Sequence, residues 1–305
     1  MATSAQAMST RDAVERRLRS GGGDTRGIVL EGALLLSLLI ALGVLVVLVG
    51  DIMIRSFPVF AERPLDFLTS PLSSRPANAG IIQGILGSVM LMAFVAVIAL
   101  PLGVGAAIYL EEYAHDTWLT RLIRTNIRNL AGVPAIVYGL LGLALFVSTL
   151  GLGKSLIAGG LTLAVLVLPI AVITTSEALR AVPNSIREAA FGVGATRWEM
   201  VRSHVVPYAA PGILTGTILT LARAFGDTAP LLMVGAIAGT FSSGGVGDML
   251  TGSYTALPTI VFNWSGQPQD EFRALTSAAI VVLLVVILLV NASAIVLRNR
   301  YDRKW

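Results

Sequence analysis

Six long apolar runs determine what this chain can fold into. About 20 mostly apolar residues, at a rise of 1.5 Å each, are enough for a helix to cross a bilayer. Only 13% of the 305 residues are charged, about half the share in an average soluble domain. We therefore expect an all-α integral membrane protein with six transmembrane helices. The expected spans cover residues 30–54, 81–110, 130–150, 156–176, 211–237 and 274–297.

The distribution of basic residues predicts the orientation of these spans. Six spans place both termini on one side, and loops on the cytoplasmic side are enriched in Lys and Arg. The two termini and the loops 111–129 and 177–208 carry 16 of the 22 Lys and Arg residues. We therefore expect both termini in the cytoplasm of a bacterium, with a multi-pass domain in its cell membrane. The predicted organisation is a cytoplasmic segment 1–29, a six-span domain 30–298 and a cytoplasmic tail 299–305.

Several classes of function find no support in the residues. Basic residues flank the apolar runs instead of forming one patch, so we expect no nucleic-acid partner. The chain has no cysteine and two histidines, too few for a metal cluster. Residues 148–155 end in the Gly-Lys-Ser of a P-loop, but no strand precedes them and the first glycine is replaced by Ser148. With no legible catalytic set, we expect a chain that is not an enzyme.

The fifth run contains charged residues at the depth of the membrane. Arg223 lies near its middle and Asp227 follows four residues later. A charge there costs roughly 2.5–3.5 kcal/mol, so such a residue faces protein or water and is a functional candidate. Arg223 could offer an anion a planar, bidentate fork of donors, with Asp227 orienting it and Thr228 adding a hydroxyl. An internal ion pair that only neutralises both charges is the alternative interpretation.

The polar segment 177–208 precedes that run and has the pattern of two short helices. The first is expected to end near Gly192 or Gly194, a plausible C-cap. Thr196 and Glu199 have the spacing of a capping box that begins the second helix. We expect that helix to stop at Val206, before a proline. A solvated loop that packs only on its own bundle is the alternative.

A second charged pair and a pair of glycines lie close to these segments in the sequence. Glu177 and Arg180 form a second pair, at spacing i,i+3, and are secondary candidates for the pathway, although solvated helix-end charges explain them as well. Gly212 and Gly216 have the spacing that lets helices approach closely in a membrane.

The spacing in segment 177–208 resembles the cytoplasmic signature of ABC importer permeases. That signature has Glu-Ala-Ala, then a glycine, an aliphatic residue and Leu-Pro; this chain departs from it with a histidine for the aliphatic residue and a valine for the leucine. The stretches NLAGVPAIVYGLLGLALFV (129–147) and LARAFGDTAPLLMVG (221–235) are similar to the PstA-type permeases of phosphate importers. The signature positions hold Glu188, Ala189, Ala190, Gly194, His204, Val206 and Pro207.

The resemblance implies a fold, a function and a set of partners. It implies the type I ABC importer permease fold and ATP-driven import of inorganic phosphate, with the pathway shared with a second, similar permease. Two ATPase subunits would hold the ATP and Mg, so no cofactor is expected on this chain, and an external binding protein would deliver phosphate ion to loops 55–79 and 239–273. Import of another oxyanion, such as phosphonate or molybdate, and an ATP-independent anion carrier or channel are the alternatives. The implied ATPase contacts are Glu188, Ala189, Ala190, Gly194, Ala195, Thr196 and Trp198.

Overall fold

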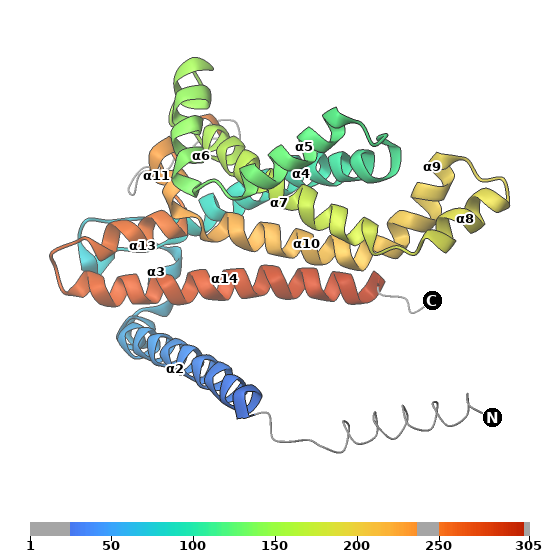
Figure 1. Cartoon of the computed structure of the whole chain (residues 1–305). Helices are drawn as coiled ribbons and strands as arrows, with labels where there is room; N and C mark the ends of the chain where they lie inside the picture. The colour runs from blue at the N-terminus through green and yellow to red at the C-terminus, as the bar shows by residue number, and fades with distance from the viewer. Residues whose placement is uncertain (1–24, 237–249, 302–305) are drawn as a thin grey trace. The chain divides into compact units, whose positions relative to one another are not determined.

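The computed structural model describes residues 25–236 and 250–301, and every regular element in those two ranges is a helix (Figure 1). The chain divides into two compact units, residues 1–52 and 53–305. In the first unit the described residues belong to one helix, α2 (Thr25–Glu62), which continues into the second unit. The apolar window of α2 buries none of its residues within the chain. Its surface is therefore available to lipid or to another subunit.

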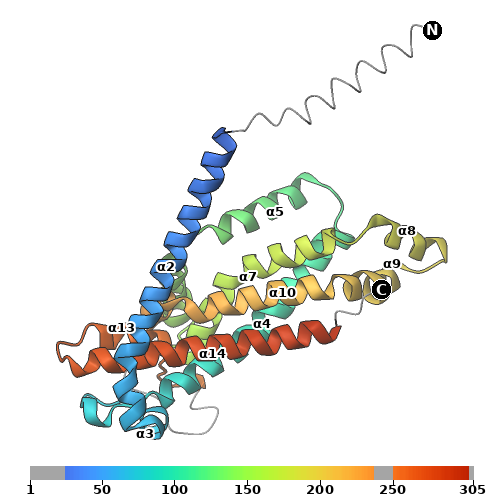
Figure 2. The ribbon, with the colours of Figure 1, turned by 90° about the horizontal axis from the view of Figure 1, so that it is seen from below.

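Four long helices form the centre of the second unit: α4 (Ile82–Ile108), α7 (Leu156–Arg180), α10 (Val206–Gly226) and α14 (Glu271–Tyr301). Helix α7 is the most buried of them, with α4 and α10 packed along it and α14 packed on α10 (Figures 1 and 2). Small residues bring α7 and α10 together, because Gly212 meets Ala178 and Gly216 meets Thr174. The close approach predicted for these two glycines is thus observed.

The third apolar run is bent. Helix α5 (Trp118–Ala131) is followed by α6 (Ala135–Gly142) and the π-helix η3 (Leu143–Thr149), and the two parts meet at 101°. The bend falls at Gly132-Val133-Pro134, where proline removes a backbone donor and disfavours helix in the residue before it. Within residues 25–236 and 250–301, five helices are long and apolar enough to span a membrane, and this bent pair makes a sixth if it counts as one span. The expected polar loop 111–129 therefore contains most of a helix.

The end of the bundle that we expect to face the cytoplasm is built from short helices. The π-helix η2 (Tyr109–Tyr113) ends α4, while α8 (Asn184–Gly192), α9 (Arg197–Met200) and the π-helix η4 (Val201–Val205) connect α7 to α10. Figures 1 and 2 show α8 and α9 at one extremity of the bundle. A buried cluster that includes Leu110, Leu179, Met200 and Val205 holds these pieces to the long helices.

The opposite end carries α3 (Pro64–Thr69), the 3-10 helix η1 (Pro76–Asn78), α11 (Thr228–Val234) and α13 (Leu257–Ser265). Phe67, Trp264 and Phe272 pack there with tilted rings in an aromatic cluster, and Ser88 Oγ accepts a 2.8 Å hydrogen bond from the first amide of α13. The expected long loop 239–273 thus includes a packed helix, and residues 239–249 of it lie outside the described residues.

Two predicted boundaries are wrong for reasons that the backbone explains. A single span over 211–237 is not present, because α10 ends at Gly226 and α11 starts separately at Thr228. The second short helix does not stop at Val206. It passes through η4 into α10, since a π-helical turn directly before Pro207 accommodates the missing proline donor.

Candidate functional site

Arg223 and Asp227 lie at a break between helices, not in the middle of a span. Arg223 occupies the last turn of α10, and Asp227 links α10 to α11 with φ −80° and ψ 95°. Pro230 explains the break, because it has no N–H to donate to the carbonyl of Gly226 and so cannot continue the ladder. The pair therefore sits where backbone direction changes, at the end of the bundle opposite to α8 and α9.

The two charges are only loosely paired. Arg223 Nε is 3.7 Å from Asp227 Oδ2, and the side chains are 45% and 27% exposed. That distance is beyond a normal hydrogen bond, and Asp227 Oδ2 is buried with no hydrogen-bond partner among the described residues. The carboxylate thus reduces the local positive charge while the guanidinium donors of Arg223 stay available to a ligand.

The surroundings of the pair are fixed by close packing between α11 and α6. A Cβ on Gly139 would lie 2.8 Å from the Cα of Pro230 and 3.0 Å from the Cβ of Met233, so only glycine allows this approach. Tyr138, the residue before it, is close enough to interact electrostatically with Arg223, and its hydroxyl donates a 2.9 Å hydrogen bond to the carbonyl of Leu130. Thr228, half-buried, begins α11 beside Asp227.

Sequence reasoning missed Tyr138 and Gly139 as neighbours of Arg223. They belong to the stretch 129–147, which was noted for its family resemblance, but nothing in a linear pattern places it against residues more than 80 positions later. The candidate Thr228 is brought next to the pair, as its spacing required.

The segment between α8 and α9 adopts the predicted helix–glycine–helix form. Gly194 has φ +85°, in the left-handed region that glycine tolerates best. Thr196 caps α9, with the capping box to Glu199 complete in both directions. These are local interactions between neighbours in sequence, which is why the sequence predicts them.

The two short helices divide the candidate docking residues into an outer and an inner set. Glu188, Ala189, Gly194, Thr196 and Trp198 are exposed, Ala195 is half-buried, and Ala190 is buried against the bundle. Three apolar side chains add to the outer surface and are unusually exposed for their type: Phe191 (47%), Val193 (84%) and Trp198 (61%).

An ion pair that the sequence did not indicate anchors α8. Arg187 Nη2 donates to Glu112 Oε1 of η2 at 2.7 Å, and the two side chains are 20% and 4% exposed. The same guanidinium donates to the carbonyls of Leu179 and Val182, at 2.9 and 2.8 Å, where α7 ends. One side chain therefore joins η2, the end of α7 and α8. Glu112 and Arg187 are 75 positions apart, so no spacing pattern could have paired them.

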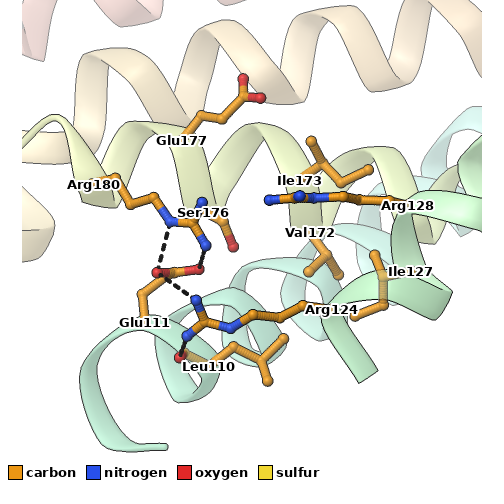
Figure 3. Close-up of a pocket in the computed structure, with 10 residues that line it drawn as sticks. All are labelled: Leu110, Glu111, Arg124, Ile127, Arg128, Val172, Ile173, Ser176, Glu177 and Arg180. Atoms are coloured by element: carbon orange, nitrogen blue, oxygen red, sulfur yellow. Dashed lines mark hydrogen bonds and ion pairs between the residues drawn. The ribbon is translucent and has the colours of Figure 1, made fainter. Parts of the chain in front are cut away.

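The candidates Glu177 and Arg180 do not form the expected pair. Arg180 makes a bidentate contact with Glu111, with Nε and Nη2 each 2.9 Å from a carboxylate oxygen. Glu177 is exposed and acts on Arg180 only through longer-range attraction. Arg180 is thus part of a cluster with residues of η2 and α5, shown in Figure 3.

Comparison with known proteins identifies the family. Residues 99–304 match the family described as "Binding-protein-dependent transport system inner membrane component". The chain belongs to this family. Its membership makes the chain a multi-pass membrane component of a transport system, and its relatives are permease subunits, not catalysts.

Curated relatives narrow the comparison. The chain is 38% identical over 172 residues to "Probable ABC transporter permease protein YqgI" of Bacillus subtilis (strain 168). The aligned region covers 56% of this chain and 58% of that protein. It is 34% identical over 236 residues to "Phosphate transport system permease protein PstA" of Mycobacterium leprae (strain TN), covering 76% and 75%. To the protein of the same name from Yersinia pestis it is 36% identical over 225 residues, covering 72% and 73%.

Solved structures agree on the fold. A chain of the inward-facing MetNI methionine ABC transporter matches with a TM-score of 0.58 at 20% identity, covering 76% of this chain and all of that one. A chain of a bacterial alginate ABC transporter, in complex with a periplasmic protein, matches with a TM-score of 0.63 at 13% identity, covering 90% and 96%. The predicted type I ABC importer permease fold is therefore confirmed.

Proposed function

We propose that this chain is a permease subunit of an ATP-driven importer of inorganic phosphate and forms half of the translocation pathway. The observation that carries the proposal is the incompletely paired Arg223 at the break between α10 and α11. Relatives named as phosphate permeases support the choice of substrate.

The geometry at Arg223 suits an anion that must be bound and then released. Arginine presents a planar fork of donors that matches the oxygens of phosphate. A conducting site has to be attractive enough to admit the ion and weak enough to let it leave. With Asp227 at 3.7 Å, the field of Arg223 is reduced but not cancelled, which meets both requirements.

The proposed assembly contains partners at both ends of the chain. The exposed apolar side chains at α8 and α9 would dock on a dimer of ATPase subunits, which hold ATP and Mg, so this chain needs no cofactor of its own. A second permease of similar fold would complete the pathway, and an extracytoplasmic phosphate-binding protein would deliver the ion. The complex would lie in the inner membrane of a bacterium. ATPase closure would then move α8 and α9 and alternate the access to Arg223.

Phosphate uptake by cells that lack the chain tests the proposal. Complementation with wild type should restore uptake of radiolabelled phosphate, and Arg223→Gln should abolish it while the complex still assembles. Arg273→Gln is the matched control, because Arg273 forms an exposed pair outside the site and should transport normally. Normal uptake by Arg223→Gln would remove this residue from the pathway.

The double variant Arg223→Gln with Asp227→Asn separates transport from structure. If the pair only neutralises its own charges, removing both should restore the transport lost in either single variant. We expect no such rescue. Competition with phosphonate and molybdate in the same assay tests the substrate, since stronger competition by either ion than by phosphate itself would contradict the assignment.

A further inference from the structure

A cavity of about 120 Å³ lies between η2, α5 and α7, at the end of the bundle that we expect to face the cytoplasm (Figure 3). It is far larger than the ~10–15 Å³ of probe volume that a single water requires. Apolar side chains of Ile127, Val172 and Ile173 form part of its wall. Three arginines, Arg124 and Arg128 from α5 and Arg180 from α7, line the rest together with Glu111, Glu177 and Ser176.

Several donors at this cavity have no acceptor. Arg128 forms no ion pair or side-chain hydrogen bond with the residues that the structure describes, and Figure 3 shows its guanidinium reaching toward Ser176. Ser176 is 9% exposed and its hydroxyl likewise lacks a hydrogen bond within the described ranges. Arg124 Nε is buried and unpartnered. Arg128 is exposed, so Arg124 Nε is the buried donor of this group, and a buried donor without an acceptor is rare in proteins and calls for an explanation.

Glu111 shows that the cluster already accommodates one oxyanion group. Its carboxylate takes both bonds of Arg180, at 2.9 Å each, and lies 3.6 Å from Nη1 of Arg124. The three arginines outnumber the two glutamates, which leaves an excess of one positive charge. Arg128, which forms no ion pair with the described residues, accounts for that excess and lines the same cavity as Ser176.

We infer that this cavity binds the tetrahedral oxyanion of a phosphate group, with Arg128, Arg124 Nε and Ser176 as donors. The inference rests on the proposed function, in which the ligand is the free phosphate ion on its way to the cytoplasm. Neither Arg223 nor Asp227 lines this cavity, so the cavity is a second binding site and not an extension of the first. Glu111 competes for Arg124 and Arg180, so binding is weakened and the ion can leave.

Direct binding of inorganic phosphate tests the inference. The complex of permeases and ATPases is purified without binding protein or nucleotide, stripped of lipid, and titrated with radiolabelled phosphate at fixed ionic strength. Wild type should bind, Arg128→Gln should weaken binding by about tenfold or more, and Ser176→Ala should weaken it several-fold. Arg121→Gln is the matched control, because Arg121 is on the same helix, 68% exposed and paired with Asp116 outside the cavity. It should bind as wild type does.

Three outcomes would overturn the inference. Absence of binding to the wild-type complex is the first, and equal binding by wild type, Arg128→Gln and Ser176→Ala is the second. The third is loss of all binding in Arg223→Gln, which would place the ion at Arg223. A further experiment adds phosphatidic acid in nanodiscs. If wild type retains this lipid, Arg128→Gln does not, and the lipid displaces phosphate from wild type, the site takes a phosphate group from a lipid and the role in ion exit is refuted. If the complex binds phosphate here but imports a different oxyanion, the proposed function fails and the site remains.

Discussion

The ion pair between Glu112 and Arg187 provides a quantitative test of how α8 is held. Arg187→Gln would remove the bonds to Glu112 and to the carbonyls of Leu179 and Val182. It would leave a carboxylate that is only 4% exposed without its counter-charge. Breaking a buried pair by removing one partner costs about 3–5 kcal/mol, mostly because the remaining charge stays buried.

That cost should appear as local unfolding of α8 away from the bundle. A loss of about 3–5 kcal/mol lowers the ratio of docked to undocked α8 by roughly two to four orders of magnitude. Hydrogen exchange of the α8 amides, measured by mass spectrometry on the solubilised complex, should therefore accelerate at least a hundredfold or reach the rate of an unprotected segment. The amides of α7 serve as an internal reference. ATP hydrolysed per phosphate imported should rise, because α8 would no longer transmit the motion.

Two controls decide whether the buried charge is the cause. Arg273→Gln breaks an exposed pair, 72% and 85% exposed, and should cost less than about 1 kcal/mol. Glu112→Gln combined with Arg187→Gln removes the stranded charge and should recover part of the protection. Exchange of α8 in Arg187→Gln within twofold of wild type would refute the reasoning.

Two glycine substitutions test backbone and packing, each with a control substitution at another glycine. Gly194→Ala should destabilise the turn after α8 by about 1–2 kcal/mol, because the φ of Gly194 is +85°, and should lower the thermal unfolding midpoint of the solubilised permease. Gly192→Ala is the control. It should leave that midpoint unchanged, because an added Cβ would have nothing within 4 Å. Gly142→Ala would drive a Cβ into Thr162 and should destabilise the folded permease by about 1–3 kcal/mol. The substitution should therefore lower both the thermal unfolding midpoint and phosphate uptake. Gly105→Ala meets no atom within 4 Å and should behave as wild type; equal effects of the paired substitutions would contradict the packing described above.

The sequence predicts those features that depend on neighbours in the chain. The capping box at Thr196 and the left-handed Gly194 are of this kind, since each needs residues three or four positions apart. The apolar runs predict spans because length and composition suffice for that purpose. The charge of Arg223 inside an apolar run made it a candidate, and family resemblance supplied the type I permease fold.

The sequence does not predict features that arise from contacts between distant segments or from breaks inside an apolar run. Residues 211–237 are mostly apolar and carry no charge apart from Arg223 and Asp227, so composition hides the end of α10 at Gly226. Pro230 was the available signal, because its missing donor falls one turn after that glycine. The bonds of Glu111 and Glu112 to arginines on other helices have no counterpart in any spacing.

Helices α9, η4 and α10 follow one another without a break, so a rotation of α9 would move α10 as a rigid body. The start of α10, near Pro207, lies beside the helices expected to meet the ATPase, and its last turn carries Arg223. Arg223 lies 17 positions after Val206, a rise of about 26 Å at 1.5 Å per residue, so a tilt of about 5° near Pro207 displaces the arginine by about 2 Å. A displacement of that size is enough to break a charge-assisted hydrogen bond, which needs a separation below about 3 Å. A small rotation of α10 at its ATPase end would therefore suffice to make or break the proposed contact between Arg223 and an anion.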